Sequence, residues 1–270
     1  MYMSNPTKIH VISDLFLRFN ERSPDDEVIP DSDLVVINGN IGHPKRSMLY
    51  VETVCKKYPD IQFIYVLGET ELHMSITKSV DEVEQSLKIR RDNSVSWPKN
   101  LHYLDSSKLI TLKNETTVDV LTVYGFPKIH SVEGEWSDTH WAKYYVADYY
   151  HFLDKDPTGK WFKPEGTSSV DHGHIPIFST MEWVNQQHEL EKEKISNWLL
   201  DRSHKKILIS HINPYIDSRF DRQKLSSYDL DLTGITWISS KSQCNINFLN
   251  ARLFSNPGRM NDKLEEELII

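Results

Sequence analysis

The sequence predicts an α/β protein built on mixed sheets, because short apolar runs alternate with longer amphipathic ones along the first ninety residues. Its length of 270 residues is typical of one large domain, and 39% apolar residues suffice to build the core. A charged fraction of 26% is typical of an ordinary protein surface. We therefore expect one folded domain rather than a disordered chain or two equal halves.

Three apolar runs near the N-terminus are predicted to be strands, over residues 9–12, 34–38 and 61–67. Between the second and third runs, apolar side chains recur at helical spacing over residues 47–58. The same spacing over residues 80–91 predicts a second helix. This order of elements is typical of strands that are joined through helices.

The later part of the chain adds further strands and one long helix. Strands are predicted at residues 118–126, 207–210, 232–238 and 248–254. Residues 180–203 carry Glu, Lys, Gln and Leu at high density, with apolar residues spaced along one face, which predicts a long helix. We expect these late strands to complete the sheets.

Residues 130–173 break this alternation, since they concentrate aromatic residues together with proline and glycine. We interpret them as an aromatic-rich cap inserted at about residues 128–178. Scaffold and cap form one predicted domain over residues 1–260, followed at 261–270 by an acidic tail that is either a short helix or frayed. Tyrosine and tryptophan are enriched at the energetic centres of interfaces. The candidates for partner contact in the cap are Trp136, Trp141, Tyr144, Tyr145 and Trp161.

The composition disfavours several classes of partner and location. The formal net charge of −8 argues against nonspecific attraction to nucleic acid. The longest apolar run is far shorter than the ~18 residues of a membrane span, so no membrane contact is expected. With only Cys55 and Cys244, and no apolar core of a signal peptide at the start, we expect an intracellular, cytoplasmic protein.

Polar residues follow several predicted strands at the point where each strand ends. Asp14 follows the first strand and Asn40 the second. Glu69 and Glu71 follow the third, and His211 follows a later one. Since ligands bind at the carboxyl ends of strands in α/β sheets, we expect these side chains to share one cleft.

In order and spacing, these residues resemble the calcineurin-like metallophosphoesterases. The family pattern is Asp-x-His, Gly-Asp-x-x-Asp, Gly-Asn-His-Asp/Glu, an isolated histidine after a strand, and Gly-His-x-His. At the first block Asp14 is retained, and Phe16 stands where the histidine belongs. At the second, Asn40 replaces the bridging aspartate and His43 the second aspartate. His211 matches the isolated histidine.

The two remaining blocks carry further replacements. In the third block Glu69 stands for the asparagine, Thr70 for the catalytic histidine, and Glu71 is retained. In the last block Lys241 and Gln243 replace the two histidines. Most of the family's metal ligands are thus replaced in this chain.

The resemblance covers about residues 8–258. It implies the metallophosphoesterase sandwich of two mixed sheets flanked by helices, here with a cap insertion. The family's chemistry uses two metal ions bridged by a carboxylate and by the attacking hydroxide. Phenylalanine and protonated lysine offer no lone pair to a metal. We therefore expect a catalytically inactive member, a pseudoenzyme without cofactor, that binds a macromolecular partner, most simply a protein.

Other interpretations stay open. The first is a remodelled phosphatase or phosphodiesterase with a single divalent metal (Mn, Fe or Zn). Its ligands would be Asp14, Asn40, Glu69 and His211. The second is a rebuilt metal site among the histidines of residues 130–188. If the protein is a pseudoenzyme, we expect the ammonium of Lys241 to replace the metal charge and to form an internal ion pair with Asp14 and Glu69.

Overall fold

A computed structural model describes most of the scaffold, and every structural statement below concerns the residues it describes. These are residues 7–15, 17, 23–68, 71, 80–125, 181–211, 230–239, 244–248, 251–255 and 267–269. The predicted cap at 128–178, with its five candidate contact aromatics, lies outside them. So do Phe16, Glu69, Thr70, Lys241 and Gln243.

The first sheet has the strand order β11-β1-β2-β3-β4. Its parallel strands are β1 (Lys8–Ile12), β2 (Leu34–Asn38), β3 (Gln62–Val66) and β4 (Leu101–Tyr103). The remaining strand, β11 (Glu267–Ile269), pairs antiparallel with β1. Because β1 to β4 are parallel neighbours in sequence order, their carboxyl ends meet at one edge of the sheet.

The second sheet has the order β5-β6-β7-β8-β10-β9. Its strands are β5 (Lys108–Thr111), β6 (Thr117–Val123), β7 (Lys205–Ser210), β8 (Ile235–Ser239), β9 (Cys244–Phe248) and β10 (Ala251–Ser255). The four inner strands run parallel, and β5 and β9 are antiparallel to their neighbours. Both sheets are therefore mixed, as the sequence predicted.

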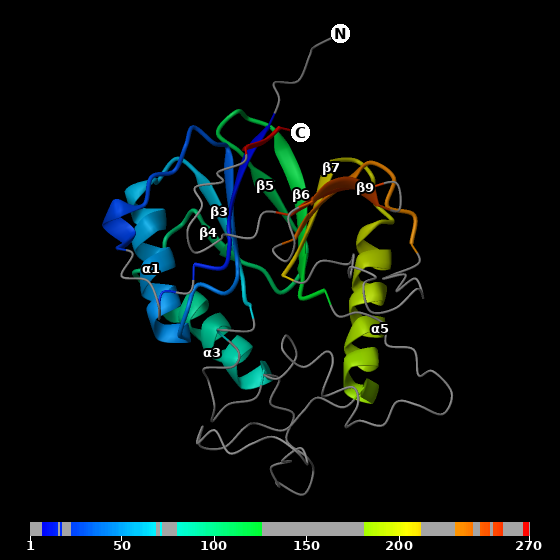
Figure 1. The fold of residues 1–270 in the computed structure, drawn as a ribbon, viewed down its shortest axis with the longest axis horizontal. Helices are drawn as coiled ribbons and strands as arrows, with labels where there is room; N and C mark the ends of the chain where they lie inside the picture. Colours follow the sequence, from blue (N-terminus) through cyan, green and yellow to red (C-terminus); the bar gives the residue numbers. More distant parts are fainter. Residues whose placement is uncertain are drawn as a thin grey trace, which may run out of the picture.

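Helices cover the outer faces of the two sheets (Figure 1). Helices α1 (Pro44–Lys57) and α3 (Val80–Asn93) pack on the first sheet, and α5 (Met181–Trp198) packs on the second. A short 3-10 helix, η1 (Pro24–Asp26), lies beside α1. None of the described helices combines the length and apolar character that a bilayer span requires.

The core follows from the alternation of side chains along each strand. In β1, Ile9 and Val11 join the cluster between the sheets, whereas Ile12 joins the cluster under α1 and α3. In β7, Ile209 faces the first sheet and Leu208 faces α5. Strands that are buried on both faces read as continuous apolar runs, which explains why the sequence signalled them so clearly.

Most predicted elements are confirmed, and some are wrong. The predicted strand at 248–254 is in fact the end of β9 and most of β10, which pair antiparallel. Residues 267–269 form a strand, so the prediction of a short helix or frayed end is wrong there. Strands β4 and β5 were not predicted, because strands of three and four residues show too little periodicity to detect.

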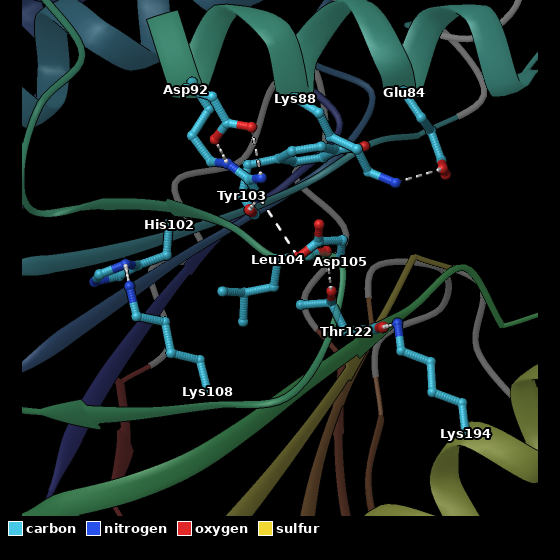
Figure 2. A network of polar contacts seen from close by, with 11 residues as sticks. Glu84, Lys88, Asp92, His102, Tyr103, Leu104, Asp105, Lys108, Thr122 and Lys194 are labelled. Atoms are coloured by element: carbon cyan, nitrogen blue, oxygen red, sulfur yellow. Dashed lines mark hydrogen bonds and ion pairs between the residues drawn. The ribbon is translucent and has the colours of Figure 1, made fainter.

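His102 joins the two sheets at their edge (Figure 2). The ammonium of Lys108 on β5 donates to its Nδ1 (3.1 Å). The proton therefore lies on Nε2, which donates to Oε1 of Gln62 on β3 (2.8 Å). Burial, and secondarily the charge of Lys108, lower the pKa of His102 from 6.5 to about 4. The folded state therefore holds this imidazole neutral.

This geometry predicts acid sensitivity. Between pH 6.5 and 4 the unfolded chain protonates His102 and the folded chain does not, so stability falls with pH by up to about 3 kcal/mol. Urea unfolding at several pH values in this range gives the free energy of unfolding as a function of pH. This dependence should be weaker for His102→Gln than for the parent. His204→Gln, at an exposed histidine, is the matched control. Equal slopes for parent and His102→Gln would contradict the assignment.

Candidate functional site

The carboxyl ends of β1, β2 and β3 meet the carboxyl end of β7 from the other sheet. The side-chain amide of Asn38 donates to the backbone carbonyl of Ser210 (2.8 Å). In return, Nδ1 of His211 donates to the carbonyl of Asn38 (3.0 Å). These two bonds cross between the sheets and fix the orientation of the His211 ring.

Asp14 and Asn40 form a direct side-chain pair at this edge. The Asn40 amide nitrogen donates to Oδ1 of Asp14 (2.8 Å), and the Asp14 backbone N–H donates to the carbonyl of Gly39 (3.1 Å). Both residues adopt left-handed backbone conformations, with φ of 55° and 57°. Asp and Asn tolerate this region better than other non-glycine residues, and the observation is consistent with a tightly constrained pair of loops.

Glu71 lies beneath the loops and is completely buried. Its Oε2 accepts the backbone N–H groups of Asn40 (2.9 Å) and Gly68 (2.8 Å). Its Oε1 accepts those of Ile41 (2.7 Å) and Gly42 (3.2 Å) and the hydroxyl of Ser47 (3.3 Å). Burial raises the pKa of Glu71, although the backbone N–H groups and His211 act in the opposite direction and lower it. The carboxylate thus ties the loop after β2 to the loop after β3.

Two glycines allow these loops to touch. A Cβ on Gly39 would lie 2.5 Å from the backbone nitrogen of Gly68 and 2.6 Å from Nδ1 of His211. A Cβ on Gly68 would lie 2.4 Å from the backbone nitrogen of Asn40. Real Cβ atoms do not approach other atoms so closely, so only glycine fits at either position without movement of the backbone.

His43 has a different place from the other predicted site residues. It is exposed and stands at the N-cap of α1, where its Nδ1 accepts the backbone N–H of Lys45 (3.3 Å) ahead of the first-turn residue Pro44. The structure therefore brings Asp14, Asn40 and His211 together at the strand ends and uses His43 to begin a helix.

Tyr124 and Glu191 also belong to this neighbourhood and were not predicted. The Tyr124 ring lies 5.6 Å from the ring of buried His211, centroid to centroid. Glu191 on α5 accepts the backbone N–H groups of Tyr124 (2.6 Å) and Gly125 (3.2 Å), just beyond β6. The predicted strand over residues 118–126 ran past Tyr124, whereas β6 ends at Val123, so the sequence did not mark Tyr124 as a residue at a strand end.

A polar chain supports this end of β6 from the first sheet to α5 (Figure 2). The hydroxyl of Thr122 donates to the carbonyl of Leu104, just after β4 (3.1 Å), and Lys194 of α5 donates to the carbonyl of Thr122 (3.0 Å). Burial lowers the pKa of Lys194, and the carboxylates led by Glu191 oppose this shift. The network ties the end of β6 to the first sheet and to α5.

The described donors offer oxygen and nitrogen atoms to a ligand. Within the part of the chain that the structure describes, no group of three His, Cys, Asp or Glu side chains is placed to hold a metal ion. Asp14 contributes a carboxylate, Asn40 a neutral amide and His211 an imidazole. Such a set can position a polar ligand through hydrogen bonds.

Comparison with known proteins finds similar structures at low sequence identity. Phosphopantetheinyl hydrolase (PptH) from Mycobacterium tuberculosis is 12% identical with a TM-score of 0.53, and the match covers 94% of this chain and 91% of that one. TT1561 of Thermus thermophilus is 11% identical with a TM-score of 0.45, over 94% and 90% of the two chains. No protein-family model and no curated protein sequence matches. The first likeness shows a metallophosphoesterase-like fold.

Proposed function

We propose that this chain is a metallophosphoesterase-like protein that does not hydrolyse phosphoesters and acts by binding a protein partner. The observation that carries the proposal is the pair formed by Asn40 and Asp14. At the position where the fold's enzymes bridge two metals with a carboxylate, this chain has an amide that donates to the neighbouring carboxylate. A neutral amide cannot supply the negative charge that two adjacent cations require.

The other replacements support the same proposal. Phe16 and a protonated Lys241 have no lone pair to offer a metal. Among the described residues, the Glu71 carboxylate already accepts four backbone N–H groups and one hydroxyl. The donors therefore do not fit a two-metal centre. If Lys241 lies at the vacated position, its ammonium would offset the charge of Asp14.

The alternative is a remodelled phosphatase or phosphodiesterase with a single Mn, Fe or Zn ion. It is favoured by the position of Asn40, which bonds to the Asp14 carboxylate and, like the His211 ring, borders Gly68. In that case Glu69 would be the fourth ligand. When bound, the metal would polarise a phosphoryl oxygen, and Asn40 would orient Asp14 toward it.

Metal titration separates the two candidates. We expect the purified parent to carry less than 0.1 equivalent of Mn, Fe or Zn (roughly background) and to show no calorimetric Mn²⁺ binding in the micromolar range. Restoring family residues by Phe16→His, Asn40→Asp, Lys241→His and Gln243→His should strengthen Mn²⁺ binding by at least about 100-fold, since even supporting groups are worth ~10- to 100-fold each. Circular dichroism of both proteins controls for folding.

The same samples test hydrolysis. Bis(p-nitrophenyl) phosphate turnover by the parent should stay at background with added Mn²⁺. One equivalent of metal in the parent, with turnover abolished by Asp14→Ala, would establish the single-metal alternative instead. For partner binding, we propose that Trp136, Trp141 and Trp161 belong to the contact surface. This assignment stays a prediction from the sequence.

A further inference from the structure

The outer edge of β1 is covered by a very short strand from the other end of the chain. In β11, Ile269, Leu268 and Glu267 pair with Lys8, Ile9 and His10 in turn. Figure 1 shows the C-terminal end of the chain beside this sheet. Among the described strands of the first sheet, β11 is the one that runs antiparallel.

The backbone of β1 directs hydrogen-bonding groups to this edge. Lys8 uses both of its backbone groups on the β2 side, where its N–H donates to Oδ2 of Asp33 (2.9 Å) and its carbonyl accepts the N–H of Asp33 (2.9 Å). Because these groups alternate along a strand, the N–H and carbonyl of Ile9 point the other way, toward Leu268. Ile9 and Leu268 are thus the hydrogen-bonded pair, and Lys8 and Ile269 a non-hydrogen-bonded pair.

The edge of β1 needs a pairing strand, and few hydrogen bonds hold β11 in that place. Ile9 is 0% exposed and His10 3% exposed, so an uncovered β1 would present unpaired polar groups beside an apolar core. Three residue pairs supply few hydrogen bonds, each worth only about 1 kcal/mol net. An extended segment from another protein would restore the same bonds, so an exchange costs little.

We propose that the β1 edge at residues 8–10 is a strand-acceptor site for an extended segment of a protein partner, which displaces β11. Partner strands commonly add to a sheet edge, where the main chain gives affinity and alternate side chains give specificity. The partner's residues opposite His10, Ile9 and Lys8 are acidic, aliphatic and aliphatic, as Glu267, Leu268 and Ile269 are.

The chemistry of β1 supports this choice of residues. Ile9 belongs to the core between the sheets, so it favours an aliphatic residue opposite. The ammonium of Lys8 pairs with Asp31 (3.2 Å), so an aliphatic residue can lie opposite Lys8, and an imidazole can donate to a carboxylate opposite His10. The acceptor site rests on the proposed partner-binding function, but it lies at the start of β1, whereas Asp14 follows its end.

The test uses the full chain, with an engineered disulfide that reversibly holds β11 on β1. Lys8→Cys with Ile269→Cys, in a Cys244→Ser background, places a disulfide at the non-hydrogen-bonded pair, where Cα atoms are about 4.5 Å apart. The probe is an acetylated peptide with the sequence of residues 264–270, LEEELII, and the readout is amide chemical-shift change in β1 by NMR. A peptide of the same composition in scrambled order is the control.

The reduced protein should bind the peptide, and the oxidised protein should bind it at least about tenfold more weakly. A second variant, Leu268→Pro, removes the N–H that faces Ile9 and should bind the peptide more tightly than the parent, because the tethered strand competes at an effective concentration in the millimolar range. Failure of the disulfide to form, equal binding in both redox states, or no β1 shifts would each overturn the proposal. Hydrolytic activity would instead count against the proposed function alone.

Discussion

Replacing Glu71 by alanine is expected to lower the free energy of unfolding by about 3–5 kcal/mol, the largest effect of any single side chain in the site. The substitution leaves four backbone N–H groups and the Ser47 hydroxyl without their acceptor in a buried place. Each buried donor without a partner costs about 1–3 kcal/mol, and water entering the space left by the side chain recovers part of the sum. Urea denaturation followed by tryptophan fluorescence measures the change.

Two further variants make this result specific. Glu193→Ala removes a carboxylate from an exposed position on α5 and should change stability by less than about 0.5 kcal/mol. Glu71→Gln keeps one acceptor oxygen but turns an NH₂ group toward backbone donors. Its loss of unfolding free energy should therefore lie between those of Glu193→Ala and Glu71→Ala. A loss below about 1 kcal/mol in Glu71→Ala would show that other groups hold the loops.

Alanine at Gly39 should destabilise the protein far more than alanine at Gly234, although the two glycines share nearly the same backbone conformation. Their φ angles are +73° and +77°, so each substitution incurs a similar cost of about 1–2 kcal/mol for a left-handed alanine. At Gly39 the new Cβ also meets the backbone of Gly68 and the ring of His211 within 2.6 Å, whereas at Gly234 nothing lies within 4 Å. Overpacking adds about 1–3 kcal/mol.

The difference between the two variants therefore isolates the close approach of the loops. Thermal and urea unfolding should place Gly39→Ala about 1–3 kcal/mol below Gly234→Ala. The NMR signals of the His211 ring should shift in Gly39→Ala and stay in place in Gly234→Ala. Equal losses would mean that backbone conformation alone explains both glycines.

The amino-acid sequence predicted the layers of the fold because their signal is local. Strands buried on both faces, such as β2 and β7, read as unbroken apolar runs. Helices with one buried face, such as α1, show apolar residues at helical spacing. The polar residue after each strand was likewise visible in the sequence, so the gathering of these residues at one edge could be predicted, whereas their contacts could not.

What each polar residue does there was decided by tertiary structure. Asn38 bonds to the carbonyl of Ser210, 172 residues away, and nothing in either local pattern indicates this partner. Glu71 and His43 stood in equivalent places in the sequence pattern, yet one is buried beneath the loops and the other caps a helix in solvent.

The short strands show the same division. Which segments bury apolar surface can be predicted from the residues of each segment alone, since burial leaves a periodic pattern in them. The pairing of β11 with β1 depends on an edge built by residues more than two hundred positions earlier, and three residues are too few to carry a period. A hydrogen bond needs a partner at the right place, and only the folded chain supplies that place.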